Sequence, residues 1–154
     1  GKEAPELRLV GDGELRPELE RLAAGLPVRF LGQVDAEEAQ LQIAKARLQI
    51  LPSEWFEGFP MVVREAFAFG TPSAVSDIGP LPSIVEHGKS GIVFQPGDPQ
   101  SLLSEVRTAW ENSNVLERLG KGARAEFEEK YTQEANYSML IDIYDKAIKV
   151  SRNG

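Results

Sequence analysis

The sequence predicts an α/β fold in which a mainly parallel sheet is flanked by helices. Two observations favour this class. Glycine and proline mark most borders between segments, and short apolar runs of the strand type alternate with longer segments of helical period. The chain has 154 residues, 42% apolar and 27% charged, so we expect a single globular domain over residues 1–154. The expected strands lie at residues 7–10, 28–32, 48–51, 73–76 and 91–94.

Two strand–helix units open the chain. The first strand ends in a glycine-rich turn, and Leu15, Leu19 and Leu22 then fall on one helical face. The second strand is followed by Asp35, which stands where a helix N-cap belongs. We therefore expect a helix after each of these two strands.

The helix after the third strand is short and is marked at both ends. An irregular segment leads to Pro60, which can occupy the first helical position because its missing N–H would have no helical partner there. Met61 to Phe69 continue the helix, and Gly70 is a suitable C′ residue. We therefore expect a helix over residues 60–69.

The last part of the chain is predicted to be mainly helical. A short helix is expected at about 81–86, and Asp98 with Pro99 opens a longer one to about Trp110. Two more helices follow. The last has an apolar stripe that needs a cover, which the chain's own sheet can provide. If the stripe is left uncovered, we predict a homodimer through this helix, or disorder after about Tyr131. Its stripe consists of Leu140, Ile143, Tyr144, Ala147 and Ile148.

Composition excludes several classes of function. The chain has no cysteine and one histidine, His87, which excludes a disulfide framework and a cysteine or histidine metal cluster, and we expect no cofactor. The formal net charge is −7, and no basic run alternates with aromatics, so nucleic acid is a poor candidate partner. No apolar run approaches the roughly 20 residues of a membrane span, and the start does not resemble a signal peptide. We therefore expect a cytoplasmic setting.

The segment between the third strand and the following helix is the best place for a ligand. In open α/β sheets, ligands bind beyond the carboxyl ends of the strands, and the N-terminus of a helix offers free N–H groups with partial positive charge. Met61 and Val62 can offer such groups even though Pro60 cannot. The segment therefore favours a phosphate group.

Two carboxylates flank this helix N-terminus. Glu57 lies just before the helix and Glu65 lies in its second turn. A carboxylate accepts two hydrogen bonds side by side, which suits the vicinal hydroxyls of a ribose or a hexose. Two diols with a pyrophosphate between them describe a sugar nucleotide. A lone glutamate pair is usually a solvated helix face, but the residues around this pair favour a binding site.

The chain resembles the group 1, or family 4, retaining glycosyltransferases. The resemblance is carried by residues 57–66 (EGFPMVVREA), 69–72 (FGTP) and 76–77 (SD), which are similar to the E-x7-E motif and G-T-P strand of that family. Further landmarks at residues 10–13, 30–32, 88–91 and 96–98 follow in the same order. The resemblance implies a Rossmann-like domain, one half of the GT-B type in which two such domains face each other.

The resemblance implies a role for each candidate site residue. Glu57 would hold hydroxyls of the donor sugar, with backbone contacts from Gly58 and Phe59 beside it. The amides of Met61 and Val62 would meet the pyrophosphate, and Glu65 would hold the ribose diol. Gln33 and Val34, after the second strand, would lie against the nucleobase. The implied partner is a nucleoside-diphosphate sugar, from which a hexosyl group is transferred with retention.

The resemblance also implies parts that we expect to be absent from this chain. A further strand and helix, with an Arg and a Lys for the pyrophosphate, precede the matching region in the family. An N-terminal acceptor-binding domain completes the active site there. We therefore expect the chain to be N-terminally truncated and inactive as a transferase by itself. The same absent half would decide acceptor choice and any peripheral association of the parent protein with a membrane.

Two other functions stay open from the sequence. The same fold could sense a nucleotide or sugar nucleotide without chemistry. A basic pyrophosphate loop and a second Rossmann-like domain encoded upstream would favour the transferase. Sugar-nucleotide epimerases share the two-domain architecture, and the E-x7-E pattern disfavours them.

Overall fold

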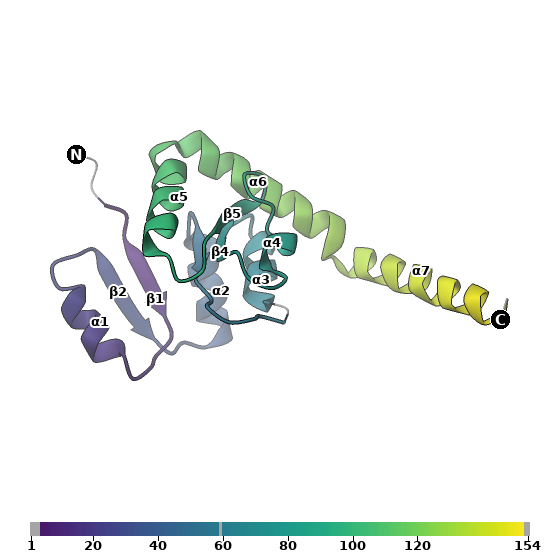
Figure 1. Cartoon of the computed structure of the whole chain (residues 1–154), viewed down its shortest axis with the longest axis horizontal. Coiled ribbons are helices and arrows are strands. Elements are labelled where there is room, and N and C mark those ends of the chain that lie inside the picture. Colours follow the sequence, from purple (N-terminus) through teal and green to yellow (C-terminus); the bar gives the residue numbers. More distant parts are fainter. Residues whose placement is uncertain (1–3, 59, 153–154) are drawn as a thin grey trace. The chain divides into compact units, whose positions relative to one another are not determined.

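A computed structural model of the chain describes residues 4–58 and 60–152. It contains two compact units, one up to Gln42 and one from Ile43 onward, and each is described by itself. Figure 1 shows the elements in colours that follow the sequence. The strands form two parallel sheets flanked by helices, which confirms the predicted fold class. The expectation of one domain over residues 1–154 stays a prediction.

The first unit is built on a two-stranded parallel sheet. Strand β1 (Leu7–Val10) pairs with β2 (Val28–Gly32), and α1 (Arg16–Leu22) connects them. Helix α2 (Ala36–Lys45) follows, and the N–H of Glu38 donates to Asp35 Oδ1 at 2.8 Å. The predicted N-cap at Asp35 is confirmed.

The second unit is built on a three-stranded parallel sheet. Its strands are β3 (Gln49–Leu51), β4 (Ser73–Ser76) and β5 (Gly91–Phe94), in that order across the sheet. Helix α3 (Met61–Ala68) connects β3 to β4, and α4 (Leu81–Ile84) connects β4 to β5. Because all three strands are parallel, the segments that follow them leave the sheet at one edge, the carboxyl edge.

Two clusters of buried side chains cover the two faces of this sheet. Val75 of β4 packs with Val63 and Phe67 of α3, whereas its neighbour Ala74 packs with Leu116 and Leu119. Successive residues of a strand point to opposite faces, so the clusters lie on opposite sides of β4. The sheet therefore has a packed layer on each face, which fixes α3 over one of them.

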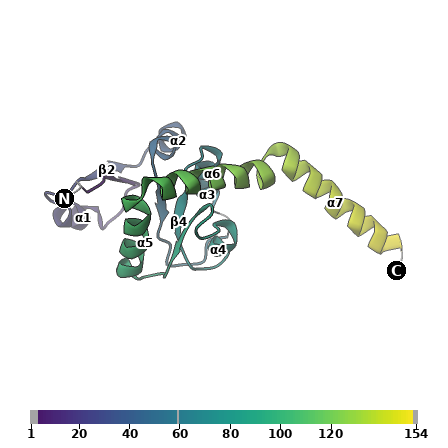
Figure 2. The ribbon, with the colours of Figure 1, turned by 90° about the horizontal axis from the view of Figure 1, so that it is seen from above.

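Three helices complete the second unit. Helix α5 (Pro99–Glu111) begins at the predicted N-cap Asp98, which accepts from two backbone N–H groups. Helix α6 (Ser113–Lys130) packs on both core clusters. Helix α7 (Gln133–Arg152) continues away from the three-stranded sheet in both Figures 1 and 2. No helix in the described part of the chain is long and apolar enough to cross a membrane.

The predicted start of the third helix is wrong by one position. Pro60 has φ −74° and ψ 94°, an extended conformation, and the helix begins at Met61. Proline therefore precedes the first helical residue and stands at the N-cap. The predicted C′ role of Gly70 is confirmed by its φ of 71°, in the left-handed region that favours glycine.

Candidate functional site

The segment between β3 and α3 lies at the carboxyl edge of the three-stranded sheet. Two other loops meet it there. A Cβ atom added to Gly79, after β4, would lie 2.8 Å from the ring of Phe56, and one added to Gly97, after β5, would lie 4.0 Å from Glu54 Oε1. The candidate site is therefore built where three strand–helix connections converge, as expected for an open α/β sheet.

Helix α3 presents an uncapped N-terminus to this loop. Its N-cap residue, Pro60, makes no side-chain cap, and the first turn contains no acidic residue. The early N–H groups of a helix have no partner within the helix and carry partial positive charge. Met61 and Val62 therefore place backbone donors where an anionic group can accept from them.

A buried serine and a half-buried glutamine fasten the first turn of α3 to the sheet. Ser73 Oγ of β4 donates to Gln49 Oε1 of β3 at 2.9 Å, and Gln49 Nε2 donates to the carbonyl of Val62 at 3.3 Å. Each polar group thus finds a partner beneath the helix, as buried polar groups require. These two hydrogen bonds link two strands to the turn that carries the candidate phosphate donors. The sequence analysis did not identify Gln49 or Ser73 as site residues, because each lies within a strand and no motif or periodicity marks it.

Glu57 is held by a serine that sequence reasoning also missed. Ser53 is only 5% exposed, and its Oγ donates to Glu57 Oε1 at 2.7 Å. Glu57 itself is half-buried and precedes α3 by a few residues. The carboxylate is thus positioned at the carboxyl edge by its own loop.

Glu65 has a different environment. It lies within α3 and is half-buried, and its carboxylate has no hydrogen-bond or ion-pair partner among the residues that the structure describes. Both predicted carboxylates therefore belong to one loop–helix segment. One is already bonded, and the other is free to accept.

The remaining candidate residues fall in different places. Gly58 is exposed beside Glu57, and Phe59 lies outside the described residues. Gln33 and Val34 follow β2 in the first unit, at the carboxyl end of that strand, where Gln33 is exposed and Val34 is half-buried. The structure thus brings together Glu57, Gly58, Met61, Val62 and Glu65 within the second unit.

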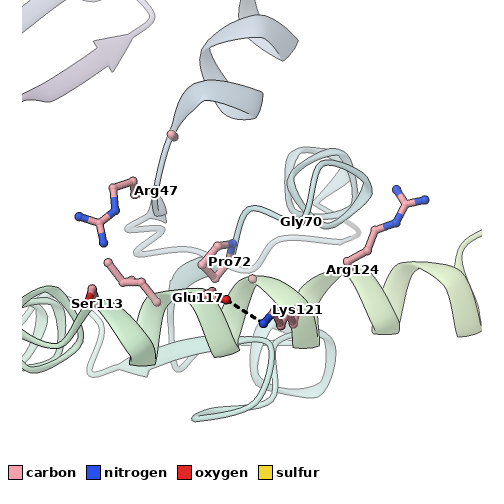
Figure 3. Close-up of a pocket in the computed structure, with 10 residues that line it drawn as sticks. Arg47, Gly70, Pro72, Ser113, Glu117, Lys121 and Arg124 are labelled. Atoms are coloured by element: carbon pink, nitrogen blue, oxygen red, sulfur yellow. Dashed lines mark hydrogen bonds and ion pairs between the residues drawn. The ribbon is translucent and has the colours of Figure 1, made fainter.

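A separate cavity of about 520 Å³ lies at the opposite edge of the three-stranded sheet. It is lined by Arg47, which precedes β3, by Pro72, which precedes β4, and by one side of α6 (Figure 3). Its basic side chains already have partners. Lys121 pairs with Glu117 at 2.7 Å, and Arg124 donates to the carbonyl of Ala68. The cavity is part of how α6 packs and does not belong to the candidate site.

Among residues 4–58 and 60–152, no group of three or more histidine, cysteine, aspartate or glutamate side chains could hold a metal ion. The arrangement instead offers backbone donors for an anion and carboxylates for hydroxyl groups.

Known proteins are similar to this chain in sequence. Sulfoquinovosyl transferase SQD2 of Arabidopsis thaliana is 32% identical over 149 residues, which cover 94% of this chain and 29% of that protein. D-inositol 3-phosphate glycosyltransferase of a Nocardioides species is 33% identical over 144 residues, covering 94% of this chain and 29% of that protein. The chain spans about a third of the length of the curated relatives it matches.

Solved structures agree on the fold. The Anabaena protein HepE in complex with UDP superposes with a TM-score of 0.79 and 26% identity, over 94% of this chain and 42% of HepE. Sucrose-phosphate synthase from Thermosynechococcus elongatus gives a TM-score of 0.77 and 26% identity, over 94% of this chain and 39% of that enzyme. These matches confirm the predicted Rossmann-like fold as part of a GT-B type structure.

The sequence profile of the family described as Glycosyl transferases group 1 matches residues 2–126. The match includes every residue of the candidate site. The resemblance found in the E-x7-E segment is thereby confirmed, and the chain belongs to the group 1 glycosyltransferases.

Proposed function

We propose that this chain is the donor-binding domain of a retaining glycosyltransferase and holds a nucleoside-diphosphate sugar at the carboxyl edge of its three-stranded sheet. The observation that carries the proposal is the uncapped N-terminus of α3 between Glu57 and Glu65. HepE, a structural relative, has been solved with UDP and with UDP-glucose, which supports the class of ligand.

The proposal gives each residue a task. The N–H groups of Met61 and Val62 donate to the pyrophosphate, whose negative charge suits the partial positive charge of the helix end. Glu65 accepts from the ribose hydroxyls, and Glu57 accepts from the donor sugar, flanked by Gly58 and Phe59. Gln33 and Val34 contact the nucleobase.

In this proposal, sugar transfer requires a further domain besides this chain. The curated relatives are about three times its length, and an N-terminal acceptor-binding domain would supply the acceptor and exclude water. The isolated chain then binds donor weakly and transfers no hexosyl group. The parent protein transfers it with retention, without a cofactor or metal ion, in a cytoplasmic setting or at a membrane surface reached through its other half.

The exposed face of α7 belongs to the same proposal. Tyr137, Leu140, Ile143, Tyr144 and Ile148 are all exposed on it. In the parent protein this face packs on the acceptor-binding domain, and in the isolated chain it supports a homodimer. Sedimentation analysis of the isolated chain tests the second part, and a monomer at millimolar concentration would contradict it.

The test of the site is a titration followed by NMR. Uridine, guanosine and adenosine diphosphates, and UDP-glucose, are added to the chain and to its Glu65→Ala variant. Glu111→Ala, an exposed carboxylate change at the C-terminal end of α5, is the matched control. We expect the nucleotide of one base to change the amide chemical shifts of residues 57–65, Gln33 and Val34. These changes should be retained in the control and lost in Glu65→Ala. Shifts that survive Glu65→Ala would contradict the assigned site.

Activity is tested in the parent protein. We expect sugar transfer that is lost in Glu65→Ala and a product whose anomeric configuration, determined by NMR, matches that of the donor. Binding without transfer would instead favour the non-catalytic module.

A further inference from the structure

The loop that carries Glu57 is anchored at two points before any ligand binds. One anchor is the hydrogen bond from Ser53, and the other is the contact between Phe56 and Gly79. The first closes the loop on itself, because Ser53 and Glu57 are four residues apart, and the second holds the loop against the segment after β4. Together they fix the path of residues 53–57.

The Ser53 anchor is a buried hydrogen bond to a carboxylate. At 2.7 Å it has the length of an O–H donor bonded to a charged acceptor, a class stronger than bonds between neutral groups. Ser53 is almost fully buried, so losing the acceptor would leave its hydroxyl unpaired at a cost. The serine therefore keeps Glu57 Oε1 in one place, while Oε2 stays available to a ligand.

The Phe56 anchor is a ring packed on a glycine. Gly79 has φ 55°, and a Cβ atom there would lie 2.8 Å from Phe56 Cδ2, so only glycine gives the ring this position. The remainder of the ring is open, since Phe56 is 72% exposed. An aromatic residue next to Glu57 is thus held against the β4–α4 turn.

We infer that Ser53 is a positioning residue for Glu57, and that the Phe56–Gly79 contact holds the loop that presents it. The proposal rests on the proposed function for the identity of the ligand. A glutamate that is already ordered does not lose side-chain freedom when a sugar hydroxyl binds to it, so binding carries a smaller entropy cost. This gain concerns the sugar alone, because Glu57 is assigned to the sugar and not to the nucleotide. The anchors therefore set affinity for the sugar moiety, and the nucleotide is held elsewhere, by α3.

The first experiment needs no ligand. NMR scalar couplings across χ1 and χ2 of Glu57 report whether one rotamer is populated. We expect one rotamer in the wild-type chain and in Ser53→Thr, which keeps the hydroxyl, and averaged couplings in Ser53→Ala. Ser138→Ala, at an exposed serine of α7, is the matched control. Averaged couplings in the wild-type chain would overturn the positioning role.

A second variant tests the other anchor. Gly79→Ala places a methyl group where the Phe56 ring lies, and we expect it to average the Glu57 couplings although Ser53 is intact. Couplings that stay unchanged, in a chain whose core amide shifts show it folded, would remove the Phe56–Gly79 contact from the proposal.

The third experiment compares binding of UDP and UDP-glucose by calorimetry or NMR. We expect Ser53→Ala to weaken UDP-glucose binding by about threefold to tenfold and to leave UDP binding unchanged. Ser53→Thr restores the UDP-glucose affinity, and Ser53→Ala has no further effect in a Glu57→Ala background. Equal loss for both ligands would overturn the proposal. A wild-type chain that binds neither ligand would contradict the proposed function, and the couplings alone would then decide the positioning role.

Discussion

Helices α6 and α7 are consecutive, similar in length and both amphipathic, and yet they are covered to very different degrees. One side of α6 is buried through Leu116, Leu119 and Ala123, on two core clusters. On α7 the large apolar side chains are exposed, among them Leu140 and Ile143. An amphipathic pattern indicates that one face of a helix is to be buried. The comparison of α6 with α7 shows that the pattern does not identify the surface that buries it.

The difference extends to charged residues. Glu126 of α6 is 3% exposed and is bonded to Lys130 at 2.6 Å and to Lys89, on the loop before β5, at 2.9 Å. Gly122 lets the same loop approach α6, because a Cβ atom there would collide with the carbonyl of Lys89. Helix α6 thus contacts both the core on the α3 side of the sheet and the 86–91 loop. Its polar residues take part in this packing.

The largest effect is expected from shortening a buried side chain of α6. Leu119 is 1% exposed among Ala74, Ile92 and Phe94, so Leu119→Ala leaves a cavity that rigid neighbours fill only in part. We expect the free energy of unfolding to fall by about 3 kcal/mol. Denaturant unfolding followed by circular dichroism measures it. A loss below about 1 kcal/mol would mean that α6 is no better packed than α7.

The next effect concerns the buried carboxylate. Glu126→Ala removes the acceptor of two lysines, and we expect a loss of about 2 kcal/mol because hydrogen bonds to charged groups are stronger than neutral ones. Glu134→Ala, an exposed change in the first turn of α7, is the control and should change little. Equal losses in the two variants would break the contrast between the helices.

The contribution of Glu126 should depend on pH. The hydrogen bond from Lys130, with one from Lys89, holds the pKa of Glu126 below its ordinary value of 4.5, against the opposing effect of burial. A carboxyl group with a lowered pKa in the folded state stabilises the fold above the unfolded pKa and loses this effect as pH falls through the folded one. The stability difference between wild type and Glu126→Gln should therefore be full at pH 6 and shrink below about pH 4. A difference that is constant from pH 6 to pH 3 would contradict the ion-pair explanation.

The smallest effect is expected on α7. Leu140 is 48% exposed, so Leu140→Ala should change the free energy of unfolding by less than about 0.5 kcal/mol at protein concentrations too low for a dimer to form. Repeating the unfolding at high protein concentration sharpens the comparison. A difference that grows with concentration would show that a second copy covers α7, and one already large in dilute solution would show that α7 packs on its own unit.

Local residue choices made much of the fold predictable. Asp35 and Asp98 are N-caps because their carboxylates can bond to free N–H groups of the next turn, an interaction within a few residues. Gly70 ends α3 because only glycine adopts its left-handed conformation at no cost. Pro60 was misplaced by one position, since proline is compatible with both the N-cap and the first helical residue.

The candidate site was predictable only in part. Glu57, Glu65 and the amides of Met61 and Val62 lie in one contiguous segment, so their order along the chain already placed them around one helix end. Ser53 escaped prediction because its bond to Glu57 depends on how the loop folds back on itself. Gln49 and Ser73 escaped prediction because their roles depend on which hydroxyl or amide faces which acceptor across two strands. Such pairings are set by the register of the sheet.

The order of strands and helices, their parallel direction and the family could be read from the chain, because each follows from short-range pattern and from motifs along it. Three features came from the folded structure alone: Phe56 lies on Gly79, a buried serine holds Glu57, and α6 is covered while α7 is exposed. These depend on contacts between residues distant in sequence or on side-chain orientation. Periodicity and composition do not encode either one, since a buried and an exposed amphipathic helix have the same pattern until a partner surface is present.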